Sequence, residues 1–513
     1  MLKMRRLVPV IICASYGLLL VAWAISNPPF AGADESAHYQ RAIGVGNGQL
    51  IGARASVSAP EGASPETASM FAWANDATRY VDVPGGLLLP NPACNAQKEQ
   101  DSASCLLGQR AIPGRSTVIT LVGNYQPEAY LVPGWLVSRA QDPLTADRLG
   151  RLGTTTTCLI LLTVAMKLLW TGEAVSLTGI LVAVTPMVLF TNAIINPSGL
   201  EISASIMFTA AILALLRRTN PAGWVWACLA VSGAMLALSR SPGPVWVVMG
   251  LVLIAILPDR RDSAARLRQN RAAVMISSLT LVVGIALNQM WERAYGSHLR
   301  LSASGFLHEL RPAVHQLPNL IRQEVGLFGS LDSPLALPLL AVWLMLALTL
   351  VCAACYLGST RERLVMATAA ILQPVVAVLF YAVFLAGSGY AAQGRHLLPF
   401  GVVVPLLAVD IVLRHRERIP ARIFRTAATA IPLVIAGVQA AAWYGNARRQ
   451  GVGLSGPLWF IPRAQWSPPL GWWTWTGVVL AAAALLGVTG LISRPGSPSR
   501  KQGAAAEAPT VSD

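Results

Sequence analysis

The strongest constraint in this sequence is a series of apolar runs, each close to the length at which an α-helix crosses a bilayer. Such a crossing takes about 17–25 predominantly apolar residues. Runs of this kind predict about twelve membrane-spanning helices. They are expected at 7–25, 152–170, 175–192, 200–216, 223–238, 244–257, 272–291, 335–357, 364–386, 397–413, 426–443 and 473–492.

The composition agrees with a membrane protein. Hydrophobic residues make up 54% of the 513 residues, and charged residues only 12%. A soluble domain has roughly a quarter charged residues, and a disordered chain has low hydrophobicity, so both classes are excluded. We therefore expect one all-α polytopic domain over residues 1–493. The stretch 494–513 lacks apolar periodicity and is expected to be a disordered cytoplasmic tail.

The net charge of +15 has two readings, nucleic-acid binding or a membrane protein with basic cytoplasmic segments. The distribution of Lys and Arg favours the second, because they are divided among several short segments on one side of the predicted spans. By the positive-inside rule, this side and both termini are cytoplasmic. These segments lie near residues 3–6, 217–218, 260–271, 361–363, 414–425 and 494–501.

The first apolar run has an alternative interpretation as a cleaved signal peptide, because Ala22 and Ala24 follow a basic start in an A-x-A pattern. The run is long for a signal peptide and has the length of a span. We expect a retained first helix.

Three long segments then face outward, at 26–151, 292–334 and 444–472. Only the first is large enough to fold partly outside the membrane. It contains Cys94 and Cys105, for which an outer, oxidising location predicts a disulfide, with two free thiols as the alternative. In the second, the alternation over 311–324 predicts an amphipathic helix at the interface.

The densest polar cluster follows the first span. Pro28 and Pro29 end that helix, and Asp34 can then cap a new one, with Glu35 in its first turn. His38 and Arg41 follow Asp34 at positions i+4 and i+7, which places the three residues near one face of that helix. The alternative to a functional site is simple capping with surface ion pairs.

Other outward turns add polar groups at the same depth: Asn196 and Glu201 before the fourth span, Arg240 after the fifth, and Arg395 with His396 before the tenth. An arginine at the end of a span can snorkel to the interface. The functional interpretation is a site for an anionic headgroup, since guanidinium offers paired donors to phosphate. No zinc-ligand spacing, Walker loop or HExxH motif is present, so a metal or other cofactor is not indicated, although a divalent metal stays an alternative.

The run Asn27 to Ala42 resembles the first-loop signature of a family of bacterial polytopic membrane proteins of unknown function. The stretch Gly326 to Pro334 and the segment Gln393 to Pro399 resemble two further marks of that family, although His396 stands where tyrosine is expected. The resemblance spans most of residues 5–415. It implies a multi-pass protein of the bacterial plasma membrane.

That family is in turn similar to the GT-C glycosyltransferases, which have many spans, a large first outer loop and an acidic residue after the first helix. The resemblance implies a sugar donor carried on polyprenyl phosphate, an acceptor in the cell envelope, and Asp34 or Glu35 as the catalytic acidic residue. His38 would position the carboxylate, and Arg395, Arg240 and His396 would bind the donor phosphate. The acceptor cleft would be formed by Tyr39, Arg41, Tyr125, Glu128, Tyr130, Asn196 and Glu201.

Two other functions stay open from the sequence. A transporter or flippase for a lipid-linked sugar would share the spans and the arginines, but it predicts charged residues deep inside the spans. In this sequence they mostly stop at the edges. A non-catalytic scaffold for envelope assembly would bind the lipid without transferring sugar.

Overall fold

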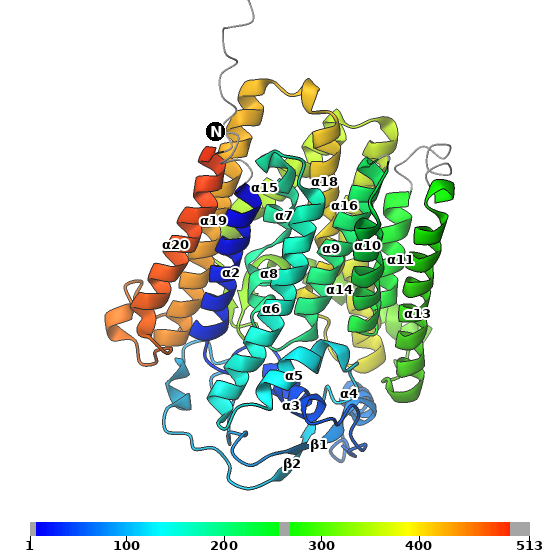
Figure 1. The fold of residues 1–513 in the computed structure, drawn as a ribbon. Coiled ribbons are helices and arrows are strands. Elements are labelled where there is room, and N and C mark those ends of the chain that lie inside the picture. The colour runs from blue at the N-terminus through cyan, green and yellow to red at the C-terminus, as the bar shows by residue number, and fades with distance from the viewer. Residues whose placement is uncertain (1–6, 219, 256–266, 493–513) are drawn as a thin grey trace, which may run out of the picture.

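The computed structural model describes residues 7–218, 220–255 and 267–492, and it is mostly helical (Figure 1). Within these residues, eight helices are long and apolar enough to cross a membrane. They are α2 (Val8–Ser26), α6 (Pro143–Leu169), α9 (Pro197–Arg217), α13 (Arg271–Tyr295), α15 (Leu337–Leu357), α16 (Thr360–Ser388), α19 (Ala421–Val452) and α20 (Gly471–Ile492).

Within the described residues, length and composition indicate eight spans, or nine if a bent pair of helices counts as one, against the twelve expected; the run expected at 244–257 extends beyond the described residues. The third run forms a broken span, in which η3 (Ala174–Leu177) and α7 (Thr178–Ala183) meet α8 (Pro186–Asn192) at a bend of 73°. Thr185 caps α8 and Pro186 is at its first turn, so the proline restarts the helix. The remaining runs form shorter helices, α10 (Gly223–Ser239), α11 (Gly243–Ala255), α17 (Leu398–Gly401) and α18 (Val403–Arg414).

The segment between α2 and α6 folds at one end of the bundle, here named the loop end (Figure 1). It contains α3 (Glu35–Gly46), α4 (Pro65–Ala77), η1 (Ala103–Leu106), η2 (Glu128–Tyr130) and α5 (Leu131–Val137). It also contains the antiparallel strands β1 (Arg79–Val83) and β2 (Ser116–Thr120). Asp142 caps α6, so this helix begins within the first predicted outer segment, whose bounds of 26–151 stay a prediction. The predicted disulfide between Cys94 and Cys105 is present.

The second and third outer segments are also partly ordered. The expected amphipathic helix is α14 (Ala303–Gly326), followed by a small hairpin of β3 (Leu327–Phe328) and β4 (Ser333–Pro334). Helix α19 runs to Val452 and so extends into the third predicted outer segment at 444–472, which also contains η6 (Ile461–Arg463). The expected all-α fold is thus helical with two small two-stranded sheets. The predicted tail at 494–513 lies outside the described residues.

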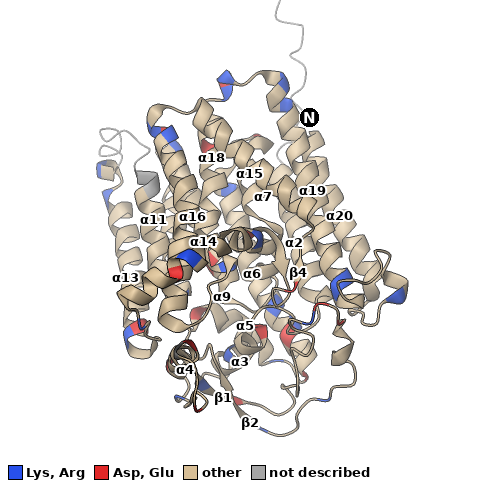
Figure 2. Ribbon diagram, turned by 180° about the vertical axis from the view of Figure 1, so that it is seen from behind, with Lys and Arg blue, Asp and Glu red and all other residues tan. Residues whose placement is uncertain are grey.

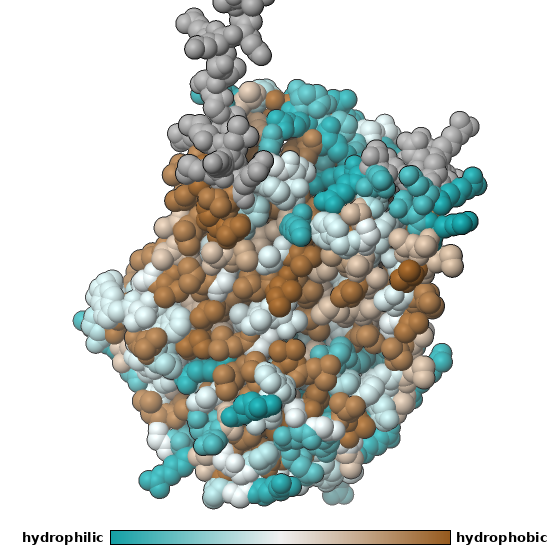
Figure 3. Space-filling view, in the orientation of Figure 1, coloured by the Kyte–Doolittle hydropathy of each residue, from teal (hydrophilic) through white to brown (hydrophobic). Residues whose placement is uncertain are grey.

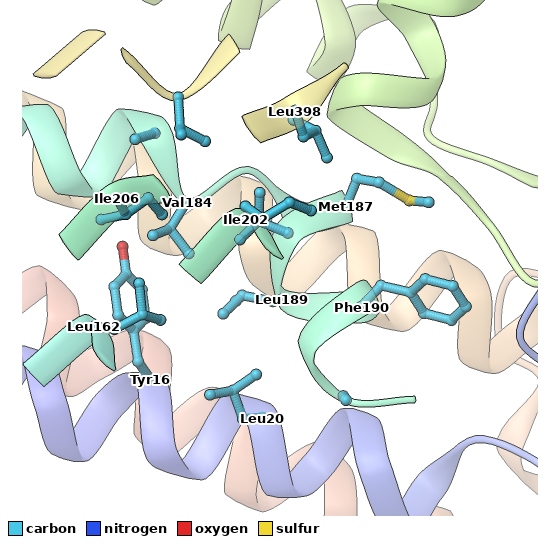
Figure 4. Packing of buried hydrophobic residues seen from close by; sticks show 14 of the residues in the cluster. Tyr16, Leu20, Leu162, Val184, Met187, Leu189, Phe190, Ile202, Ile206 and Leu398 are labelled. Atoms are coloured by element: carbon cyan, nitrogen blue, oxygen red, sulfur yellow. The ribbon is translucent and has the colours of Figure 1, made fainter. Parts of the chain in front are cut away.

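The core of the bundle is built around α9, which is buried along most of its length. Figure 4 shows Tyr16 and Leu20 of α2 facing Leu162 of α6, Leu189 of α8 and Ile202 of α9. Buried apolar packing of this kind fixes the helices against one another, and thereby fixes the positions of the side chains at their ends.

The surface has the character of a membrane protein. On the face shown in Figure 3, apolar residues are frequent across the middle of the molecule, with polar residues more frequent toward both ends. Lys and Arg are sparse along the middle of the helices and more frequent at their ends (Figure 2). The helices α13, α15 and α16 expose many large apolar side chains, as lipid-facing helices do. The orientation of the two ends stays a prediction from the basic residues.

Candidate functional site

Asp34 and Arg395, which are 361 residues apart in the sequence, form an ion pair at the loop end. Arg395 Nη2 lies 2.5 Å from Asp34 Oδ2, and Arg395 Nη1 donates to the carbonyl of Ala33 at 3.0 Å. The Arg395 side chain is 3% exposed, whereas that of Asp34 is 53% exposed. The pair therefore consists of a buried cation that holds an accessible carboxylate in place.

The backbone presents this carboxylate outward. Asp34 is the N-cap residue of α3 but has a left-handed conformation, with φ of 59°, and its side chain does not cap the helix. Partial burial raises the pKa of Asp34, but the charge and hydrogen bond of Arg395, with help from Arg240, lower it more, so that the pKa lies below its ordinary value. The carboxylate of Asp34 is thus ionised and accessible.

Arg240 follows α10 and lies on the other side of this cluster. Its Nη1 is 3.3 Å from Ser198 Oγ and 3.8 Å from Glu201 Oε2, and its guanidinium lies 5.6 Å from the ring centre of Tyr125. Its buried Nε has no hydrogen-bond partner among the described residues. A charge-assisted hydrogen bond is normally about 2.7–2.9 Å long, so Arg240 makes weaker contacts through its terminal nitrogen than Arg395 does, although the Nε of Arg395 also has no hydrogen-bond partner among the described residues.

His38 and His396 are buried beside these charges. His38 Nδ1 is 2.7 Å from the hydroxyl of Tyr130, so its described hydrogen bond goes to that ring and not to Asp34. Burial lowers the pKa of His38 to about 3, and burial together with Arg240 and Arg395 also lowers the pKa of His396. Both imidazoles are neutral, and they supply no positive charge for a phosphate. His396 instead accepts from the backbone amide of Gln393 at 3.4 Å.

Glu35 is placed in a different environment from Asp34. Its carboxylate is fully buried and receives Arg151 Nε and Nη2 at 2.8 and 2.6 Å, and the backbone amides of Gly32 and Ile195 at 2.9 and 3.0 Å. Arg151 also pairs with Asp147 at 2.9 Å. Because both oxygens of Glu35 are already bonded, the expected sharing of the base role with Asp34 is not supported, and Glu35 is a structural residue.

Several residues expected in the acceptor cleft hold the loop end together. Arg41 is buried and donates to the carbonyls of Leu50 and Tyr125 at 2.6 and 2.7 Å. Tyr39 donates to the carbonyl of Leu87, and Asn196 caps α9 through Ser198 N. These side chains form hydrogen bonds to the backbone of the same chain, so the geometry gives them no direct role in binding.

The other members of the expected cleft lie nearer to the charged cluster. Tyr130 bonds His38, Tyr125 packs against Arg240, and Glu201 accepts from Trp246 Nε1 at 3.0 Å while it faces Arg240. Glu128 has one buried oxygen without a partner, and burial raises its pKa to about 8. These residues surround the site rather than line a separate cleft.

A pocket of about 440 Å³ adjoins Arg240. Its lining includes the polar residues Tyr125, Gln126 and Glu292 and the aromatic residues Trp73, Phe380 and Phe384. A volume of this size is typical of a small-molecule site. The ring of Trp73 also packs at 5.0 Å against Tyr390, whose hydroxyl is within electrostatic range of Asp34. The pocket and the accessible carboxylate therefore belong to one region.

No group of three or more His, Cys, Asp or Glu side chains that could hold a metal ion occurs within residues 7–218, 220–255 and 267–492. The charged groups near Asp34 are mostly arginines, which can balance the charge of a phosphate without a metal.

Sequence reasoning did not identify Arg151, Asp147 or Glu292. Arg151 lies at the predicted end of the first outer segment. It is 116 residues from Glu35 in the sequence, so no local pattern indicates that the two side chains pair. Glu292 lies at the predicted boundary between the span at 272–291 and the outer segment at 292–334. The signal that could have found them is the presence of a charged residue next to a long apolar run, which is costly without a partner.

Comparisons with known proteins place the chain as follows. The model of a family described as "Predicted membrane protein (DUF2142)" matches residues 18–404. No curated protein matches the chain. Two solved structures of ArnT from Cupriavidus metallidurans are similar to it. The apo structure has a TM-score of 0.43 and 11% identity, and covers 94% of this chain and 76% of ArnT. The structure bound to undecaprenyl phosphate has a TM-score of 0.42 and 12% identity, and the match covers 95% of this chain and 76% of ArnT.

Proposed function

The chain belongs to the DUF2142 family of predicted membrane proteins, and we propose that it is a glycosyltransferase of the bacterial plasma membrane. In this proposal it transfers a sugar from a polyprenyl-phosphate donor to an acceptor of the cell envelope. The observation that carries the proposal is the accessible, ionised carboxylate of Asp34, held by Arg395 beside the partly unpaired guanidinium of Arg240.

The chemistry assigns one role to each group. Asp34 takes the proton from an acceptor hydroxyl while the oxygen of that hydroxyl forms a bond to the anomeric carbon of the donor. The bond between that carbon and the phosphate oxygen breaks, and the electron pair leaves with the lipid phosphate. Arg240 stabilises the charge of this phosphate. The reaction is a single displacement with inversion.

The role of Arg395 differs from the one expected from the sequence. Two of its terminal nitrogens already donate to Ala33 and Asp34, so we assign it to holding the base, and we assign the phosphate to Arg240. Positive charge near Asp34 keeps it ionised, which makes Arg395 a positioning residue.

A second cavity supports a lipid substrate. It has a volume of about 400 Å³ and lies among α7, α14, α15, α16 and α18, with Ile321, Trp343, Leu344 and Leu348 on its wall. An apolar cavity among membrane helices can take part of a hydrocarbon chain. Such a chain would anchor the phosphate at the membrane end where Arg240 lies.

The position of charged residues favours a surface reaction over transport. Within the described spans, charged side chains lie near the ends of their helices, as Asp147, Arg151 and Glu201 do. A transport path predicts such groups deep within the bilayer.

The test is Asp34→Asn in a strain from which the gene has been deleted, scored for envelope glycans, with Asp101→Asn as the matched control at an exposed site of the loop end. Loss of a general base typically lowers the rate by about 10²–10⁴-fold. We expect the glycan to be lost with Asp34→Asn and kept with the control, at equal expression. Wild-type glycan with Asp34→Asn at normal expression refutes the assignment.

A further inference from the structure

The pocket beside Arg240 has one aromatic wall. Phe380 and Phe384 of α16 are stacked with their ring centres 5.5 Å apart, and Trp73 of α4 meets Phe384 edge-on at 6.4 Å. All three rings are partly exposed. Flat, apolar ring faces at a pocket wall are suited to the C–H faces of a pyranose.

The same pocket is also lined by a fixed carboxylate, that of Glu292. Glu292 Oε1 accepts hydrogen bonds from Gln126 Nε2 and from Ser241 Oγ, each at 2.7 Å. Among the described residues, no donor contacts its second oxygen, Oε2. The two bonds orient the carboxylate, and the second oxygen is left to accept a hydroxyl from a ligand.

Glu292 is linked directly to the proposed phosphate site, because its donor Ser241 follows Arg240 in the chain. Because Arg240, Glu292 and the three rings line one pocket, a sugar attached to a phosphate at Arg240 can reach both Glu292 and the rings. Arg293 also lines this pocket, but it is exposed to solvent, where its interaction with a bound anion is screened.

We infer that this pocket is the sugar subsite of the proposed reaction, and that it takes a neutral pyranose and rejects a uronate. Glu292 accepts hydroxyl protons from a neutral sugar, whereas it repels the carboxylate of a uronate. This inference rests on the proposed function and deepens it by naming the class of sugar.

The experiment measures binding of three probes to the purified full chain in lipid nanodiscs by isothermal titration calorimetry. The probes are decyl phosphate, decyl phosphoglucose and decyl phosphoglucuronate. Hydrogen bonds to a charged group predict about a tenfold gain or more for phosphoglucose over decyl phosphate. We expect no such gain for phosphoglucuronate.

Three variants test the residues. Glu292→Gln is expected to reduce the difference between the two sugars by about tenfold. Trp73→Ala should remove most of the gain from glucose and leave binding of decyl phosphate unchanged, and Trp135→Ala, on an exposed site of α5, should change neither. Arg240→Gln should weaken all three probes.

The outcomes separate the two proposals. If decyl phosphate fails to bind, or binds independently of Arg240, the phosphate site of the proposed function is wrong. If it binds through Arg240 but glucose adds nothing, or glucuronate binds as well as glucose, the sugar subsite is overturned and the phosphate site is kept. Should Glu292→Gln fail to fold, Trp73→Ala against Trp135→Ala decides the question.

Discussion

Replacement of Arg151 by methionine tests how the loop end is joined to the bundle. Arg151 of α6 is fully buried between Glu35 and Asp147, and it also donates to the carbonyls of Ala24, Asn27 and Pro28 at the end of α2. One side chain thus connects α6, α3 and the end of α2. Its removal leaves two buried carboxylates without a cation.

The expected magnitude follows from that arrangement. Removal of one partner of a buried ion pair costs about 3–5 kcal/mol, and Arg151→Met should reach at least this range because two acids lose their partner. Glu35→Gln should cost less, since Arg151 keeps Asp147 and the amide can still accept from Gly32 or Ile195. The triple variant Arg151→Met, Glu35→Gln, Asp147→Asn should recover part of the loss.

The assay is thermal unfolding of the purified full chain in detergent, followed by tryptophan fluorescence. We expect the apparent Tm to fall in the order wild type, Glu35→Gln, Arg151→Met, with the triple variant above Arg151→Met. Equal stability of Arg151→Met and wild type would falsify the role of this side chain. A triple variant no more stable than Arg151→Met would show that uncompensated charge is not the cause of the loss.

Two further predictions concern the loop end. The pKa of His38 is about 3 in the folded protein, because burial disfavours its charged form, whereas in the unfolded chain it is near 6.5. Between these two pH values the unfolded state binds more protons than the folded state. The free energy of unfolding should therefore fall as the pH drops below about 6.5. His38→Gln should flatten that dependence in thermal unfolding from pH 7 to 4, and an unchanged pH profile contradicts the assignment. Loss of the disulfide in Cys94→Ser with Cys105→Ser should destabilise the outer segment by about 2–4 kcal/mol, seen as faster proteolysis near residues 94–105; identical digestion rates with and without the disulfide would refute this.

The positions of the helices could be predicted from the sequence because the length of an apolar run is local information. The errors lie where the run is short or broken. Pro186 restarts a helix at a sharp bend, and the run at 397–413 is divided between α17 and α18. Helix α19 continues beyond the apolar run at 426–443 and through polar residues to Val452, where packing rather than hydropathy maintains the helix.

The sequence predicts that Asp34 and Arg395 lie at the same end of the bundle, but it does not show that they meet. Residues at the same end of their spans share a depth, so two polar turns on one side need only to be neighbours within a plane. The partners of Glu35 could not be predicted in the same way. Asp34 and Glu35 are adjacent in the chain, yet one is accessible and the other is fully buried, and only the position of Arg151 decides between them.

The two arginines of the site have different proposed roles because nearby carboxylates neutralise their charges to different extents. Arg395 has a carboxylate at 2.5 Å and a backbone carbonyl at 3.0 Å, so an incoming phosphate would have to displace Asp34 and remove the base from its position. Arg240 has its nearest carboxylate oxygen at 3.8 Å, and that oxygen of Glu201 lacks a hydrogen-bond partner among the described residues. A phosphate can therefore approach Arg240 without breaking a strong pair. Because Ser241 next to it orients Glu292, the same turn after α10 connects the recognition of phosphate with that of sugar.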